Sequence, residues 1–414
     1  MKGLCLAILL GLGIAGGAQA ETQLFTRENI DGWVDVRAAT ADGERGWLDG
    51  GFGKLRYGND SRLAVAQAAL VWKPRLSDTV TGYMVAQYTP DALKPWGIEE
   101  AFIKWKPVPV SDLKYSVRFG QMFPPVSMEH DGAGWSVSRT LTPSAANAWI
   151  GEEVLVDGIE GAVQKTFGGH VLGLMGAVFT GNDTSGTILT WRGWALHDIA
   201  SNRDSVLPLP AGQKGWAQIF NTGRQAPFSD VSAEIDGNSG EYVRLDWRPP
   251  APFAVNLEYY ANEADPEAMR HSQWGWDTRF WNLGVQARPA GNVEVLAQYM
   301  SGTSVMGWRR SDGWAFDVAF DTAYLLATRE LANGARLTGR ADYFAVKDRS
   351  WQSRDDNTEK GYAATVAYMR PLNAHLDLAV EALHVVSHRP SRSYQSLEPR
   401  QVQTQLQVAL KVKL

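Results

Sequence analysis

The sequence predicts an all-β protein, a transmembrane antiparallel β-barrel of about 16 strands, with 18 strands as the alternative. Three observations predict this fold class. Strand-like segments alternate apolar and polar residues, short and long connections take turns along the chain, and the last segment is an amphipathic strand. No apolar stretch after residue 20 is long enough for a membrane helix, so a helical membrane protein is excluded.

The final segment, Pro399 to Leu414, shows the alternation most clearly. Successive side chains of a strand point to opposite faces. One face carries Val402, Thr404, Leu406, Val408, Leu410, Val412 and Leu414. The other carries Gln401, Gln403, Gln405, Gln407, Ala409, Lys411 and Lys413. We expect this strand to face lipid on its apolar side and to pair with the first strand, because an open edge in lipid would leave backbone groups unsatisfied.

The chain begins with the features of a secretory signal peptide. Lys2 precedes an apolar stretch from Gly3 to Gly17, and Ala18-Gln19-Ala20 supplies a small-x-small cleavage site. Residues 1–20 are therefore expected to be removed, and 21–46 to form an N-terminal segment before a barrel over 47–414. The only cysteine, Cys5, lies in the signal peptide, so neither disulfides nor thiol chemistry are predicted for the mature chain.

The connections between strand-like runs predict two different rims, as in transmembrane barrels. Short connections bearing Pro or Gly are expected at 73–78, 107–112, 167–169, 248–252, 288–292, 329–334 and 370–374. Long polar connections are expected at 124–152, 182–240, 263–276, 302–312, 348–359 and 388–398. Counting from Arg62 gives about fifteen strands, and an even total requires one more before it. We assign that strand to Trp47 to Tyr57. Trp33 to Ala39 and Trp216 to Asn221 are left over, and both would have to join the wall to reach 18. With 16 strands, Trp33 to Ala39 is either an N-terminal segment or an extension of the first strand.

Composition narrows the functional classes. The chain has 17 Trp, 13 Tyr, 14 Phe and 41 Gly, which fits strands with interfacial aromatic belts and tight turns. Trp47, Trp105, Trp247, Trp281, Trp308 and Trp351 are assigned to those belts. The formal net charge is −5, and no basic cluster stands out, so a nucleic-acid partner is not predicted.

Charged residues on the polar faces of the strands are the candidate pore-lining set. Facing charges across a water-filled lumen set ion preference, although they could also form ion pairs that only fill the barrel. The set consists of Lys104, Arg118, Arg244, Asp246, Arg248, Glu258, Glu294, Arg336, Arg340, Asp342, Asp377, Glu381, Lys411 and Lys413.

A family resemblance enters at Val117 to Glu129, where a strand ends in Gly120-Gln121 and a Pro- and Ser-bearing turn follows. With Glu100 to Trp105 and Arg62 to Tyr88, this segment resembles the phosphate-selective porin O/P family. The resemblance implies an outer-membrane porin of about 16 strands, often a homotrimer, whose long loop folds into the pore.

That loop, 124–152, is the candidate constriction, with Glu129, His130, Asp131, Arg139 and Glu152 as its charged or titratable residues. Phe123 stands where the family commonly has Lys, and the loop lacks the ring of Lys or Arg that an anion filter needs. Phosphate selectivity is therefore not carried over.

The resulting functional prediction is a water-filled channel in the outer membrane of a Gram-negative bacterium, for passive diffusion of small hydrophilic solutes or ions, including anions such as phosphate. Its partners would be outer-membrane lipid and lipopolysaccharide. The alternative is a secreted soluble β-rich protein that binds or hydrolyses carbohydrate. No zinc spacing or G-x-S-x-G turn is present, so no enzyme activity, catalytic residue, cofactor or metal is predicted. Trp191, Trp194 and His197 either line a sugar path or pack the long loop onto the barrel. Asp355, Asp356, Asn357 and Glu359 are assigned to a solvated loop rather than to a cation site.

Overall fold

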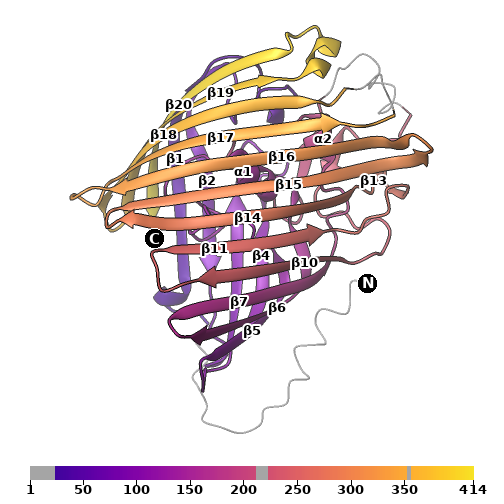
Figure 1. Ribbon diagram of the computed structural model, residues 1–414. Coiled ribbons are helices and arrows are strands. Elements are labelled where there is room, and N and C mark those ends of the chain that lie inside the picture. Colours follow the sequence, from indigo (N-terminus) through magenta and orange to yellow (C-terminus); the bar gives the residue numbers. More distant parts are fainter. Residues whose placement is uncertain (1–23, 211–221, 352–355) are drawn as a thin grey trace.

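The wall of the molecule is a closed antiparallel barrel, seen in Figure 1 as a ring of tilted strands around several inner segments. The computed structural model describes residues 24–210, 222–351 and 356–414. Within these ranges sixteen strands close the wall, each paired with its neighbours along the chain, which confirms the predicted fold class. The predicted signal peptide and Trp216 to Asn221 lie outside the described residues.

The barrel strands differ in length, and the longest pair forms one side of the wall (Figure 1). In order they are β1 Ile30–Ala41, β2 Asp60–Trp72, β3 Val80–Tyr88, β4 Trp96–Trp105, β5 Leu113–Met122, β6 Val156–Phe167, β7 His170–Thr180, β10 Gly240–Arg248, β11 Phe253–Ala261, β14 Asp277–Ala290, β15 Val293–Arg310, β16 Gly313–Glu330, β17 Arg336–Asp348, β18 Glu359–Asn373, β19 Leu376–His388 and β20 Arg400–Lys413.

The long connections contain small elements of their own. Two short sheets pair β8 Val206–Pro208 with β9 Phe228–Asp230, and β12 Met269–Arg270 with β13 Gln273–Trp274. The helices are α1 Ala145–Glu153 and α2 Thr187–Trp191, with 3-10 turns at Arg27–Asn29, Trp47–Asp49 and Pro390–Gln395. None of the helices among the described residues is long and apolar enough to cross a membrane.

The final strand closes the barrel as predicted. β20 pairs antiparallel with β1, with Trp33 opposite Lys413 and Ala41 opposite Gln405. Leu414 continues the contact, because its backbone N–H donates to the Gly32 carbonyl at 2.9 Å. The two strands most distant in sequence therefore satisfy each other's backbone groups, and neither presents a free edge.

The assignment of the first strand was wrong. Trp33 to Ala39 belongs to β1, so the wall begins at Ile30 rather than at residue 47. Trp47 to Tyr57 lies instead in the loop between β1 and β2, with the Trp47 side chain 1% and the Leu55 side chain 0% exposed. The parity argument could not separate the two segments, because either one completes an even count.

The predicted long loop at 302–312 was also wrong. β15 and β16 continue through most of it, and Arg310 pairs with Gly313 across a turn. Each strand is 18 residues long. The polar composition of this stretch resembled that of a loop. Nevertheless, β15 and β16 extend past the ends of the strands beside them, and their backbone groups hydrogen-bond to each other there.

The two faces of the wall differ in polarity. Outward side chains are apolar and exposed, as on β20, where Leu406 is 53% and Val408 is 44% exposed. Inward side chains are often polar and buried, as Gln403 and Gln405 are on the same strand. Toward the long-loop ends of the strands, inward aromatic residues pack on the loops inside the barrel. One hydrophobic cluster joins Tyr242, Tyr260, Phe280, Phe320 and Phe344 of the wall to Trp149 of α1.

Candidate functional site

The barrel interior is crossed by residues 123–155, the inward-folding loop between β5 and β6. The loop leaves β5, passes several opposing strands and returns through α1 to β6. The Ser144 hydroxyl caps α1 by accepting from the Asn147 N–H at 3.4 Å. Every residue of α1 is buried, and Trp149 meets the wall ring of Phe320 at a centroid distance of 5.2 Å. The predicted inward loop is therefore a packed element of the interior.

Glu129 and Arg340 form the main fastening of this loop to the wall. The Glu129 carboxylate accepts from the Ser144 hydroxyl at 2.6 Å and from the Asn147 amide at 2.6 Å. Arg340 of β17 donates to Glu129 at 3.3 Å, to the Thr142 carbonyl at 2.6 Å and to the Pro143 carbonyl at 3.0 Å. Its Nε also pairs with Asp342 at 2.8 Å. These buried contacts fix the loop before α1 begins.

Further charged residues of the predicted pore-lining set hold the same loop. Glu381 of β19 accepts from the Leu141 N–H at 2.6 Å, and Asp342 accepts from the Ala145 N–H at 3.2 Å. Glu294 of β15 pairs with Arg139 at 2.6 Å. The loop is thus bonded to β15, β17 and β19, on the wall opposite the strands from which it departs.

Two other long loops pack inside the long-loop end of the barrel, the one between β1 and β2 and the one between β7 and β10. The β7–β10 loop is joined to α1 by the buried Glu152, which accepts two bonds from Arg192, at 2.6 and 2.8 Å, and lies 3.5 Å from His197. Burial would raise the pKa of Glu152, but the neighbouring Arg192 and His197 lower it to about 2. Glu152 is therefore a charged residue that joins α1 to the β7–β10 loop.

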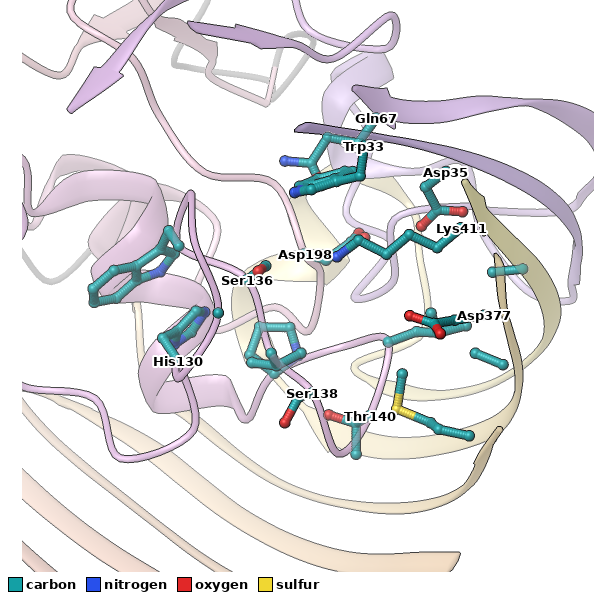
Figure 2. Close-up of a pocket in the computed structure, with 18 of the residues that line it drawn as sticks. Trp33, Asp35, Gln67, His130, Ser136, Ser138, Thr140, Asp198, Asp377 and Lys411 are labelled. Atoms are coloured by element: carbon teal, nitrogen blue, oxygen red, sulfur yellow. The ribbon is translucent and has the colours of Figure 1, made fainter. Parts of the chain in front are cut away.

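One cavity of about 430 Å³ lies between the inward-folding loop and the strands β1, β2 and β18 to β20; we call it the mixed chamber. Gly334 and Pro371 place one end of it at the rim with the short turns. Its walls carry charges of both signs, and the Lys411 ammonium lies 4.1 Å from the centre of the Trp33 ring. Figure 2 shows Asp198 and Lys411 directed into this space, near the loop that carries Ser136 and Ser138.

A second cavity, of about 370 Å³, lies on the other side of the loop between β4 and β14; we call it the basic chamber. Five basic side chains and a single carboxylate, Asp246, line it. The basic residues are Lys104, Lys106, Lys114, Arg244 and Arg248. Asp246 pairs with Arg244 at 2.7 Å, and within the described ranges no carboxylate lies within ion-pair distance of the other four cations. This chamber therefore carries uncompensated positive charge.

The structure separates the predicted pore-lining residues into three groups. Lys104, Arg244, Asp246 and Arg248 line the basic chamber, while Arg336, Asp377, Lys411 and Lys413 line the mixed chamber. The others are inside the wall but engaged or covered. Arg118 pairs with Glu160 at 2.6 Å, and Glu258 is 0% exposed. Arg340, Asp342, Glu294 and Glu381 hold the loop, as described above.

The sequence suggested free charges in the inward-folding loop, but most of its charged residues are buried or paired. Glu129 and Glu152 are buried and bonded, and Asp131 pairs with Arg139 at 2.8 Å. His130 lines the mixed chamber with its ring stacked on Trp135 at 4.2 Å. Burial lowers the pKa of His130 to about 3, so it is neutral. The excess of acidic over basic residues in this loop, which argued against anion passage, is therefore largely shielded from solvent.

Sequence reasoning missed three residues that meet at the inner end of the mixed chamber: Arg37, Arg56 and Asp198. Arg37 was overlooked because Trp33 to Ala39 had been left outside the wall. The alternation of Asp35 and Arg37 with Val34 and Val36 was the signal that could have found it. The pairing with Arg56 and Asp198 had no local signal, because three separate segments supply it.

The remaining sequence hypotheses are decided by burial. Trp191 and Trp194 are 3% and 0% exposed, so they pack the long loop rather than line a path for sugar. His197 is only 1% exposed, but it is one of the residues that line the mixed chamber. Trp47 is buried inside the barrel and is not an interfacial residue, whereas Trp105, Trp247, Trp281 and Trp308 are exposed on the wall. Asn357 and Glu359 are 0% and 1% exposed, so their assignment to a solvated loop was wrong. Glu359 forms ion pairs with Lys54 and Arg389 instead. Asp355 lies outside the described residues.

Comparisons with known proteins place the fold. No family model and no curated protein sequence matches the chain. Among solved structures, the outer-membrane channel DcaP of Acinetobacter baumannii has a TM-score of 0.58 at 11% identity, over 95% of this chain and 99% of that one.

Two porins give weaker likenesses. An anion-selective porin from Comamonas acidovorans has a TM-score of 0.50 at 11% identity, and OmpF of Salmonella typhi has 0.50 at 12%; each covers 95% of this chain and 100% of its own. At such identities the likeness concerns the fold alone, which is that of a 16-stranded porin-type barrel. The resemblance to the phosphate-selective porin O/P family stays a prediction.

Proposed function

We propose that this protein is a channel of the Gram-negative outer membrane through which small hydrophilic solutes or ions diffuse passively. The observation that carries the proposal is the polarity of the wall. Apolar side chains such as Leu245, Leu325 and Val366, 53%, 57% and 58% exposed, cover its outside. A continuous exposed apolar surface of this kind requires lipid, because in water it would drive aggregation.

The secreted soluble alternative fits this wall poorly. A soluble β-protein buries the apolar face of its strands, whereas here the glutamines of β20 are inside and its valines and leucines are outside. Lipid and lipopolysaccharide are thus the proposed surroundings of the wall. The short turns would face the periplasm, and the long loops the outside. Assembly as a homotrimer remains an expectation from the resemblance, to be tested by cross-linking in detergent.

The basic chamber supports a preference for anions in such a channel. Positive charge on a low-dielectric wall raises the local concentration of anions and lowers that of cations. Four of its cations, Lys104, Lys106, Lys114 and Arg248, have no carboxylate within ion-pair distance among the described residues. The mixed chamber contributes little net field, because its charges are of both signs.

Conductance in a planar bilayer tests the proposal directly. The purified protein should show stepwise ion currents, and a salt gradient should give a reversal potential of the sign for anion preference. Changing Lys104, Lys106 and Lys114 together to Gln should move that potential toward zero. The same number of changes at Arg75, Arg309 and Arg310, outside both chambers, is the matched control.

Two results would contradict these proposals separately. Recovery in a soluble periplasmic fraction, with no difference in gel migration before and after boiling, would remove the channel. Stepwise currents with cation preference would leave the channel standing and remove only the anion preference.

A further inference from the structure

A row of alternating charges runs from the mixed chamber to the rim with the long loops. It begins on β1, continues through the loops that fill this end of the barrel and ends at the start of β2, where side chains are exposed. Its members, in order of contact, are Asp35, Arg37, Asp198, Arg56, Asp91, Arg62 and Asp60. Much of the remaining packing at this end is apolar, with Trp47, Trp191 and Leu189 fully or nearly fully buried. The row is therefore a polar path through an otherwise largely apolar filling.

The centre of the row is one carboxylate held by two guanidinium groups. Asp198 Oδ2 lies 2.8 Å from Arg37, and its Oδ1 lies 2.9 Å from Arg56. The two arginine side chains are only 2% and 1% exposed. Burial would raise the pKa of Asp198, but Arg37 and Arg56 together hold it well below its usual range. The two arginines come from the wall and from the β1–β2 loop, whereas Asp198 comes from the β7–β10 loop.

Arg37 is open to the chamber and retains bonding capacity, whereas Arg56 is not among the residues that line the chamber. Both Arg37 and Asp198 line the mixed chamber, and Figure 2 shows Asp198 directed into it. The buried Nε of Arg37 has no hydrogen-bond partner among the described residues. A solute in the chamber thus meets Arg37 and the loop residue Asp198, which joins Arg37 to Arg56. Arg37 is also paired with Asp35, and Arg56 with Asp91.

We propose that Arg37 and Arg56 form a binding site for the carboxylate group of a permeating solute, and that Asp198 occupies this site when no solute does. Exchange of one carboxylate for another preserves the charge and the hydrogen-bond geometry around both guanidinium groups. It therefore replaces the bonds that both guanidinium groups would lose at a vacant site, where Arg37 would keep only Asp35 and Arg56 only Asp91 as carboxylate partners among the described residues. Displacement of Asp198 also removes one of the contacts that hold the β7–β10 loop to the wall. This proposal rests on the proposed channel function.

The first experiment asks whether the arginine pair accepts a free carboxylate. Asp198→Ala vacates the site, whereas Asp198→Asn removes the same charge but still fills the space. The temperature of the heat-induced shift in gel migration is measured in sodium acetate and in sodium chloride at equal ionic strength. Acetate should raise the midpoint of Asp198→Ala by at least roughly 2 °C over chloride. It should not raise the midpoint of Asp198→Asn. Equal responses of the two variants would overturn the proposal.

Folding of the alanine variant is itself a readout. If Asp198→Ala refolds poorly, acetate in the refolding mixture should raise its folded yield and chloride should not. No rescue by acetate would also overturn the assignment. Neither measurement requires that the protein conduct ions.

The second experiment asks whether the site acts during permeation. The acetate-to-chloride permeability ratio is taken from the reversal potential with one anion on each side of a bilayer. Arg56→Gln should lower this ratio severalfold, while Arg75→Gln, at the rim of short turns, should leave it unchanged. An unchanged ratio in Arg56→Gln means that acetate does not use the site and overturns its role in permeation. Absence of any current in the unmodified protein would instead contradict the channel function.

Discussion

Substitution of Arg340 by Met should loosen the attachment of the inward-folding loop to the wall. Arg340 is 3% exposed and joins β17 to the loop through Glu129 and the carbonyls of Thr142 and Pro143. Methionine has a comparable length and fills part of the space, but it donates no hydrogen bond. The change therefore removes the electrostatic fastening while limiting the cavity that is left.

The expected cost follows from the groups that lose their partner. Glu129 and Asp342 would remain buried without their shared cation, and breaking a buried ion pair in this way costs about 3–5 kcal/mol. The two carbonyls each lose a bond worth about 1 kcal/mol, although water entering the loosened loop recovers part of that. A net loss of about 5 kcal/mol is a large part of the stability of an ordinary domain.

Two measurements check this prediction. The midpoint of the heat-induced gel shift should fall by many degrees, and single-channel currents should become larger or noisier as the loop moves. Arg336→Met is the matched control, because Arg336 lies on the same face of β17 but is bonded only to Ser138 of the loop. If Arg340→Met and Arg336→Met behave alike, then Arg340 does not fasten the loop.

Three further predictions concern the wall, α1 and pH. Val408→Arg should lower the free energy of unfolding by about 2–4 kcal/mol if the wall lies in lipid, and by almost nothing if it lies in water. The free energy is measured by urea titration in detergent or liposomes. Val110→Arg, in a short turn, is the control. Trp149→Ala removes a side chain that is 1% exposed, and should lower the free energy of unfolding by about 3–5 kcal/mol in the same titration. The pKa of His130 is lowered to about 3 by burial, so the unfolded chain binds more protons there below its ordinary value of 6.5. The contribution of His130 to the free energy of unfolding is fully present above pH 6.5. It is lost as the pH falls below 6.5, by up to about 1.4 kcal/mol per pH unit. His130→Phe, which keeps a ring against Trp135, should lose less stability than the unmodified protein between pH 6.5 and 5; parallel pH profiles would contradict this assignment.

The wall could be predicted because its signals are local. The alternation along β20 and the short turn at 73–78 depend on neighbouring residues only, and both appear in the structure where the sequence indicated them. The turn predicted at 370–374 lies later in the chain, because β18 continues to Asn373. The closure of β20 on an early strand also followed, since no edge can remain open in lipid. These features determine a barrel and its approximate strand count.

The identity of the first strand and the contents of the barrel were decided by tertiary contacts. Trp33 to Ala39 and Trp47 to Tyr57 are both apolar enough to be strands, and only pairing with β20 distinguishes the first from the second. Likewise, Glu129 reads as a pore charge in sequence, and only its contact with Ser144 and Arg340 makes it a buried fastening. Residues far apart in the chain become partners through loop packing, which no local pattern encodes. The sequence by itself therefore determined an amphipathic wall, whereas the chambers and the site of Arg37, Arg56 and Asp198 exist only because three loops fold into the space that the wall encloses.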